Sequence, residues 1–309
     1  MSHAHPRLSL NQATIKYASF DEALALTADA GIRSIGLWRE PVAEVGLAQA
    51  ATRLTASGLR FSSLCRAGFF TAPEGPERRR AIDDNRRAIE ETVTLAAAGA
   101  DGSAAVLVLV AGALPEGSKD LAGARSRVQD AIAELVPDAI AAGVTLGVEP
   151  LHPLFAADRA VVSTLGQALD IAEQFPAEAV GAIVDTYHIW WDPQVLNQIA
   201  RAAAGRRIAS YQVCDWLTPL PADVLLGRGQ PGEGHIDFAP MTRAVLDGGY
   251  TGDIEVEIFN QAIWDAPAAE TVRRTIDAFA AAVPVDPAVA ALAAADVEAP
   301  AVGVPALQV

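Results

Sequence analysis

The chain alternates short apolar runs with longer helical segments, and this alternation repeats eight times. Residues 104–110 and 144–148 are unbroken apolar runs, as in strands buried on both faces of a parallel sheet. Residues 76–98 and 120–142 are long helical segments, and each is followed at once by a glycine that can end a helix. Eight strand–helix units in succession predict a (β/α)8 TIM barrel, which is an α/β fold.

The predicted boundaries follow from this periodicity and from cap residues, such as Ser19 before a helix and Gly31 after it. The predicted strands are residues 8–12, 32–38, 59–65, 104–110, 144–149, 180–185, 208–212 and 253–257. The predicted helices are residues 21–30, 42–57, 76–98, 120–142, 162–174, 193–204, 238–246 and 268–282. A doubly wound open sheet is the main alternative, but it usually carries a glycine-rich phosphate turn after its first strand, and residues 11–14 contain no glycine.

We expect a single barrel domain over residues 1–283, followed by a C-terminal extension over residues 284–309. The extension is rich in alanine and proline. It is either a short helix packed on the barrel or an extended tail, and the sequence leaves both alternatives open.

Charge and cysteine content narrow the classes of partner. The 309 residues carry a formal net charge of −15, which argues against a nucleic-acid partner and disfavours an anionic membrane surface. Cys65 and Cys214 lie far apart on predicted strands, which fits free thiols in a reducing compartment better than a disulfide. Residues 1–10 contain no apolar signal core, and no apolar run is long enough for a membrane span. We therefore expect a cytoplasmic protein without a nucleic-acid or membrane partner.

Four oxygen-bearing side chains stand at the ends of four consecutive predicted strands: Glu149, Asp185, Gln212 and Glu257. In a barrel these strands are neighbours, and their C-terminal ends meet at one mouth. Three carboxylates gathered there would repel one another unless a cation lay between them. The oxygen-rich set predicts one divalent metal ion, Mn2+ in the first place, with Mg2+ or Co2+ as alternatives.

Five short motifs carry a resemblance to a known family: Gly147-Val-Glu-Pro-Leu, Asp185-Thr-Tyr-His188, Gln212-Val-Cys-Asp215-Trp216, Gly232-Glu-Gly-His-Ile-Asp237 and Glu255-Val-Glu257-Ile-Phe. Over roughly residues 8–283 the chain resembles the sugar phosphate isomerase/epimerase family of the xylose-isomerase-like TIM-barrel superfamily. The resemblance implies that Glu149 and Glu257 are both metal ligands and the acid/base pair. It also implies that Asp185 is a metal ligand and that His188 contacts a substrate hydroxyl. Many relatives have a histidine where this chain has Gln212, whose amide oxygen is a weaker ligand than imidazole.

The expected chemistry begins when one carboxylate removes a proton from the carbon beside a sugar carbonyl, and the second carboxylate returns a proton. A bound cation stabilises the enediolate that forms. We therefore expect a divalent-metal-dependent isomerase or epimerase acting on a keto-sugar or a related polyol. One alternative is a lyase, deglycosidase or dehydratase that expels a group from a 3-oxo-glycoside or inosose through the same enolate. Another is a non-catalytic sugar-binding subunit, although such a subunit would not need both Glu149 and Glu257.

Five further residues near predicted strand ends are candidates for substrate binding: Trp38, Arg66, His152, Asp215 and Arg228. Trp38 would stack on a sugar ring or pack in the core, and Arg66 would bind substrate oxygens or pair with a structural carboxylate. His152 would face the mouth or the surface, and Asp215 would shape the rim. Arg228, in the long loop of residues 218–234, would neutralise an anionic substrate or lie in solvent. The expected partner is a small sugar, and the expected assembly is a homo-oligomer or a complex with a small second subunit.

Overall fold

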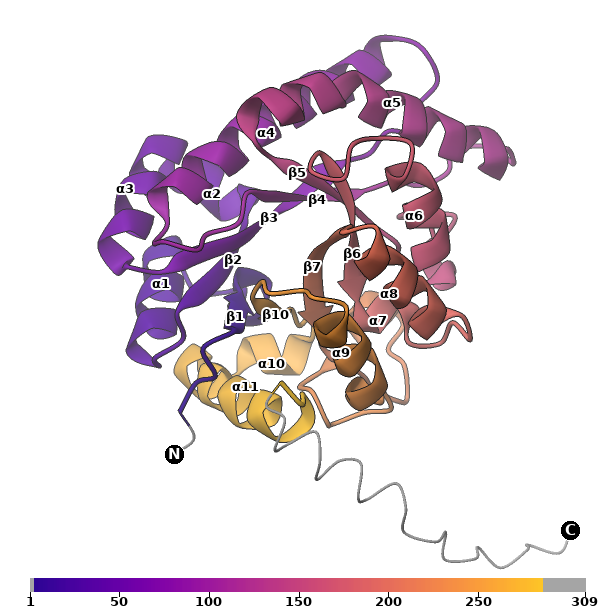
Figure 1. The fold of residues 1–309 in the computed structure, drawn as a ribbon. Coiled ribbons are helices and arrows are strands. Elements are labelled where there is room, and N and C mark those ends of the chain that lie inside the picture. The colour runs from indigo at the N-terminus through magenta and orange to yellow at the C-terminus, as the bar shows by residue number, and fades with distance from the viewer. Residues whose placement is uncertain (1–2, 286–309) are drawn as a thin grey trace, which may run out of the picture.

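Eight parallel strands close into a barrel in the computed structural model, which describes residues 3–285 (Figure 1). The strands follow one another around the ring in chain order, and β10 closes the barrel between β7 and β1. The barrel strands are β1 (Leu8–Asn11), β2 (Ser34–Trp38), β3 (Arg60–Gly68), β4 (Val106–Val110), β5 (Thr145–Glu149), β6 (Val180–Asp185), β7 (Ile208–Val213) and β10 (Ile254–Val256). Each strand lies within a few residues of a predicted one, and the predicted TIM barrel is confirmed.

Helices surround the barrel and bury its outer face (Figure 1). The longer ones are α1 (Phe20–Asp29), α2 (Arg39–Val45), α3 (Leu47–Ser57), α4 (Pro76–Ala98), α5 (Leu121–Ala142), α6 (Leu165–Ala172), α8 (Val195–Ala204), α9 (Phe238–Asp247) and α11 (Ala268–Ala282). Ser19 caps α1 as predicted: its hydroxyl accepts the Glu22 N–H, and the Glu22 carboxylate accepts the Ser19 N–H. The single helix predicted over residues 42–57 was wrong, because Gly46 adopts a φ of +83° and separates α2 from α3.

Short elements follow the C-terminal ends of several strands and shape the mouth of the barrel. They are η1 (Gln12–Ile15), η2 (Pro153–Phe155), α7 (Thr186–Ile189), the antiparallel pair β8 (Asp215–Trp216) and β9 (Arg228–Gly229), η3 (Val224–Leu226) and α10 (Gln261–Asp265). This end of a TIM barrel is the one that carries active sites. The loops there are held in place by side chains, which we describe below.

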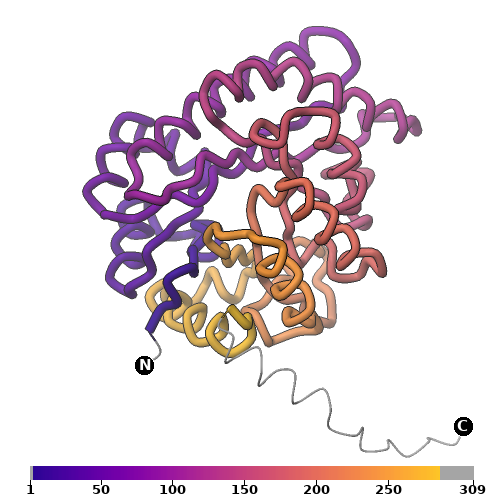
Figure 2. The backbone as a smooth tube through the Cα atoms, viewed as in Figure 1, coloured from indigo at the N-terminus to yellow at the C-terminus, as the bar shows by residue number. Residues whose placement is uncertain are grey.

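The two ends of the described chain lie side by side. The indigo start and the yellow end of the tube in Figure 2 lie close together, and β1 packs against α11. The rings of His5 and Phe279 are 6.0 Å apart. Within residues 3–285, no helix has the length and apolar character that crossing a membrane requires. Most of the predicted extension, residues 286–309, lies outside the described residues.

Candidate active site

A cavity of about 1150 Å³ opens at the C-terminal ends of the barrel strands. Glu149 at the end of β5 and Glu257 just after β10 line it, and both side chains are almost fully buried. Asp185, at the end of β6, is fully buried beside them. The strand ends therefore bring together the three carboxyl groups that the sequence placed there, because parallel strands in a closed barrel all end at the same mouth.

Arg228 supplies the positive charge among these carboxyl groups. Its Nη1 donates to Glu257 Oε2 at 2.9 Å and lies 3.4 Å from Asp185 Oδ2. The guanidinium carbon lies 4.7 Å from the centre of the Tyr187 ring and 4.8 Å from that of Phe259. Only 2% of the side chain is exposed, so of the two alternatives left by the sequence the structure excludes the solvated loop arginine.

His188 lies on α7, one turn after Asp185, and is also buried. Its Nδ1 accepts the backbone N–H of His152 at 3.1 Å. Nε2 lies 3.0 Å from Arg228 Nη2 and 3.8 Å from Asp185 Oδ2. Burial lowers the pKa of His188 well below its usual value, and the neighbouring Arg228 lowers it further, so the ring is neutral.

The environment raises the pKa of each of the three carboxyl groups. For Glu149 the main cause is burial, followed by the nearby Glu257 and Asp185 carboxylates, and its pKa rises well above the usual range. Burial also raises the pKa of Glu257, to about 7, although the Arg228 guanidinium opposes that rise. For Asp185, Arg228 and the Tyr187 N–H oppose the effect of burial, and the pKa is still raised. In the metal-free protein, some of these three carboxyl groups are therefore protonated near neutral pH.

The donor atoms suit a divalent cation. One donor atom each from Glu149, Asp185 and His188 lies within 4.8 Å of the other two, which is the only such group of acidic, histidine or cysteine side chains among residues 3–285. Gln212 Oε1 is buried and has no hydrogen-bond partner, so it is an oxygen donor left available. Carboxylate and amide oxygens are the ligands that Mn2+ and Mg2+ prefer. The group of Glu149, Asp185 and His188 does not include Glu257, which is instead held by Arg228.

The predicted rim residues divide into two sets. Trp38 and Arg66 line the cavity, where the Arg66 guanidinium lies 5.7 Å from the Trp38 ring and 5.4 Å from the Phe69 ring. Trp38 Nε1 donates to Asn11 Oδ1 at 2.8 Å, which fixes the indole. Phe69 was not predicted; it has a φ of +63° and is 45% exposed at the rim. A bulky side chain held at positive φ beside a cavity is a feature that functional sites often show.

His152 and Asp215 do not line the cavity. The His152 ring lies 4.8 Å from the Trp216 ring and 5.5 Å from the Trp191 ring, and burial lowers its pKa to about 4. Asp215 is fully buried and organises the long loop. Its carboxylate accepts four backbone N–H groups, those of Trp216, Gly232, Gly234 and Ile236.

Comparison with known proteins agrees with this architecture. A family model described as the xylose isomerase-like TIM barrel matches residues 24–282. The chain belongs to the xylose isomerase-like TIM barrel family. The solved structure of protein SMc04130 from Sinorhizobium meliloti 1021 is 46% identical with a TM-score of 0.84, and the match covers 90% of this chain and 98% of that one.

Two curated relatives of this xylose isomerase-like barrel have named activities. The 3-dehydroshikimate dehydratase of Pseudomonas putida is 32% identical over 114 residues, or 34% of this chain. The inosose isomerase of Bacillus licheniformis is 28% identical over 134 residues, or 42% of this chain. The matches span only 17% and 46% of those two proteins. The named activities are therefore those of the relatives and are not assigned to this chain by the matches. These two curated relatives are an isomerase and a dehydratase.

Glu255 is a buried residue of this xylose isomerase-like barrel to which the sequence analysis gave no role. It lies on β10 two positions before Glu257, and its carboxylate accepts hydrogen bonds from Asn11, Ser63 and Gln212 inside the barrel. The alternation Glu255-Val256-Glu257 could have indicated that Glu255 faces the same side as Glu257, because residues two apart on a strand face the same side. Only the tertiary structure identifies the residues that it contacts.

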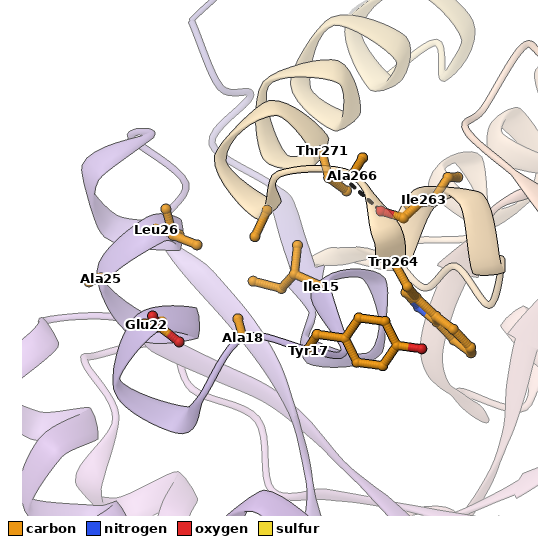
Figure 3. A pocket seen from close by; sticks show the side chains of 11 residues that line it. Ile15, Tyr17, Ala18, Glu22, Ala25, Leu26, Ile263, Trp264, Ala266 and Thr271 are labelled. Carbon is orange, nitrogen blue, oxygen red and sulfur yellow. Dashed lines mark hydrogen bonds between the residues drawn. The ribbon is translucent and has the colours of Figure 1, made fainter.

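A second, smaller cavity of about 400 Å³ lies outside the barrel, between η1, α1 and the helices α10 and α11 (Figure 3). Its wall is mostly apolar, with Ile15, Leu26 and Ile263 around it. Tyr17 and Trp264 belong to this wall and to the wall of the large cavity, so the two spaces adjoin. Glu149, Asp185 and Glu257 do not line it.

Proposed function

We propose that the protein is a divalent-metal-dependent isomerase or epimerase that acts on a keto-sugar or a related polyol. It would act by moving a proton on the carbon beside the carbonyl. The observation that carries this proposal is the pair Glu149 and Glu257, two buried carboxyl groups that line one cavity. Burial raises the pKa of both groups. Carboxyl groups whose pKa is raised toward or above neutral pH can serve as the acid and the base of one reaction.

Glu257 is the proposed base. Its pKa of about 7 leaves a large fraction ionised at neutral pH, and Arg228 stabilises the charge through Oε2. The second carboxylate oxygen then remains for the proton beside the sugar carbonyl. Glu149, whose pKa burial raises well above the usual range, is the proposed proton donor. The strands β6 and β7 separate β5 from β10 around the ring, so the two groups would approach a bound sugar from different sides.

Neighbouring side chains would bind and orient the sugar. His188 Nε2 and the Arg228 guanidinium lie together beside Glu257, where the guanidinium offers N–H donors and the imidazole a further hydrogen-bonding nitrogen to sugar hydroxyls. Trp38 and Arg66 at the rim would cover the ring and exclude water, as aromatic side chains do in sugar sites. A buried donor that hydrogen-bonds to a substrate oxygen also discriminates against analogues that lack that oxygen.

Glu149, Asp185, Gln212 and Glu257 would hold one divalent ion, with Mn2+ as our first choice and Mg2+ or Co2+ as alternatives. All four side chains offer oxygen donors, and Gln212 Oε1 has no other partner. When bound, the ion supplies positive charge that stabilises the negative charge developing on the sugar oxygens. A competing ligand set consists of Glu149, Asp185 and His188.

Elimination is the second candidate reaction. The match to a 3-dehydroshikimate dehydratase favours it, since a dehydratase begins with the same removal of a proton beside a carbonyl. The substrate would then be a 3-oxo-glycoside or an inosose, and Glu149 would protonate the group that leaves. A purely sugar-binding role is disfavoured, because a buried carboxyl group such as that of Glu149, which has no ion-pair partner among the described residues, costs stability unless it serves a reaction or a ligand.

The compartment and the assembly are also proposals. Cys65 and Cys214 are both buried free thiols, which supports a reducing, cytoplasmic compartment. A homo-oligomer or a small second subunit could complete the rim of the site. Gel filtration with light scattering of the purified chain, alone and from the native source, tests the assembly.

The experiment that tests the function combines metal analysis with a substrate screen. We expect about one divalent ion per chain after incubation with Mn2+. Ketoses, inososes and 3-oxo-glycosides are then incubated with the protein in D2O, and NMR follows deuterium at the carbon beside the carbonyl. The true substrate should gain deuterium and form a product, which distinguishes isomerisation, epimerisation and elimination.

Two variants assign the roles. Glu257→Gln should abolish both exchange and turnover, whereas Glu149→Gln should abolish turnover and still exchange the proton that Glu257 removes. Glu178→Gln, at an exposed position far from the mouth, is the matched control and should behave like the wild type. Turnover near that of the wild type in both active-site variants would overturn the two-carboxylate mechanism.

A further inference from the structure

Gln212 occupies a position where its two amide atoms have different environments. Its Nε2 donates to Glu255 Oε1 at 2.9 Å, whereas its Oε1 is buried without any hydrogen-bond partner. An amide can be turned over so that its oxygen and nitrogen exchange places, and only its partners decide which way it lies. A carboxylate that accepts hydrogen bonds therefore fixes the nitrogen on its own side.

The strand register places Gln212 between two carboxyl groups. Gln212 on β7 pairs with Asp185 on β6 on one side and with Glu255 on β10 on the other. Register partners in a parallel sheet face the same side, so the three side chains form one row inside the barrel. Because the nitrogen is bound at the Glu255 end of this row, the oxygen is left for the end that holds Asp185.

Glu255 is itself held by side chains of the neighbouring strand β1 and of β3, further round the barrel. Asn11 Nδ2 donates to its Oε1 at 2.7 Å, and Ser63 Oγ donates to its Oε2 at 2.9 Å. Its side chain is fully buried. Gly36 on β2 makes the room that it needs, since a Cβ there would lie 2.4 Å from Glu255 Oε2. The carboxylate therefore cannot move away from Gln212 without breaking contacts with β1 and β3.

We propose that Glu255 is a positioning residue that turns the Gln212 amide so that its oxygen serves the metal site. The inference rests on the metal-dependent function proposed above. Glu255 has two effects on the amide. It excludes the orientation in which the Gln212 NH2 group would face a cation, and by accepting the N–H it polarises the carbonyl oxygen into a better donor. This pairing explains how an amide can occupy a position where imidazole would be the stronger ligand.

A double-mutant cycle on Mn2+ affinity tests the proposal. Calorimetric titration is carried out on the wild type, Glu255→Gln, Gln212→Leu and the double variant. In the wild-type background Glu255→Gln should weaken Mn2+ binding about 10–100-fold, as is typical for groups that orient a metal ligand. In the Gln212→Leu background the same change should have little further effect. Equal effects in both backgrounds would mean that Glu255 acts by its charge alone, which overturns the proposal.

A second measurement needs no change at Glu255, in case that variant fails to fold. Selective 15N labelling of glutamine identifies the Gln212 side-chain amide by its absence in Gln212→Leu. Its N–H protons should exchange with solvent slowly in the metal-free wild type, because Glu255 accepts them in the barrel interior. Fast exchange would overturn the proposed orientation. A wild-type protein that binds no Mn2+ would instead overturn the metal-dependent function, which is a distinct result from additive effects in a protein that binds it.

Discussion

The Arg228 guanidinium donates from Nη1 to Glu257 Oε2 at 2.9 Å, and both side chains are almost fully buried. The pair joins the long loop after β7 to the proposed base at the end of β10. A buried ion pair contributes little net stability on its own, but removal of one partner leaves an uncompensated charge in a medium of low polarity. The loop therefore controls the charge of the site.

Arg228→Met should lower the free energy of unfolding by about 3–5 kcal/mol above neutral pH, where Glu257 would be ionised and unpaired. Urea denaturation followed by circular dichroism measures the loss. Arg201→Met is the control, because Arg201 forms an ion pair with Glu173 at 2.6 Å but remains 34% exposed. That change should cost about 1 kcal/mol or less. Similar losses in both variants would contradict the role of Arg228 as the counter-charge of Glu257.

His188→Ala should leave the metal content near that of the wild type while turnover on the true substrate falls by about 100-fold or more. Nδ1 of His188 is engaged by the His152 N–H, and its Nε2 lies beside Arg228, so both ring nitrogens already have neighbours in the site. Elemental analysis and steady-state kinetics measure the two quantities. Loss of the metal together with activity would show that His188 is a metal ligand. Its donor atom lies close enough to those of Glu149 and Asp185 for that role.

Asp215→Ala should destabilise the protein by about 3 kcal/mol or more, because four buried backbone N–H groups would lose a charged acceptor. The loop of residues 218–234 should also become a site of rapid proteolysis. Urea denaturation and limited proteolysis with mass spectrometry test both effects. If stability and proteolysis stay unchanged and only KM rises, Asp215 contacts the substrate, as the sequence analysis expected.

The metal-free protein should lose stability as the pH rises, because the pKa of Glu257 is raised in the folded state. Relative to the usual value of 4.5, the folded carboxyl group binds its proton more tightly, with a pKa of about 7. Its stabilising contribution is therefore full below about pH 4.5 and is lost as the pH rises through about 7. The Tm of the wild type should fall over this range relative to that of Glu257→Gln, which does not titrate.

Mn2+ should reverse this trend, because the ion and the proton compete for the same carboxyl oxygens. The increase in Tm on adding Mn2+ should be larger near pH 8 than near pH 5. Scanning fluorimetry with and without the ion, at constant ionic strength, measures the difference. An increase independent of pH would show that the ion binds away from the carboxyl groups.

Local sequence patterns determined which segments became strands and where each strand ended. Runs such as residues 144–148 must be buried on both faces, and the carboxyl group that ends the run then reaches the mouth. The placement of Glu149, Asp185 and Glu257 at the mouth could therefore be predicted without a structure, because it depends on position along a strand. The helix break at Gly46 could not, because a glycine within a helical pattern is compatible with both a continuous and a broken helix.

Only the closed barrel decided which residues meet. Asn11 and Glu255 are 244 positions apart, yet Asn11 Nδ2 and Glu255 Oε1 lie within 2.7 Å, because β1 and β10 become neighbours when the ring closes. Arg228 reaches Glu257 from an irregular loop, whose path depends on the buried Asp215 and not on any periodic pattern. The hydrophobic periodicity of the sequence indicates whether a side chain is buried. The partner of a buried charge, in contrast, is set by contacts between segments that are distant in the sequence.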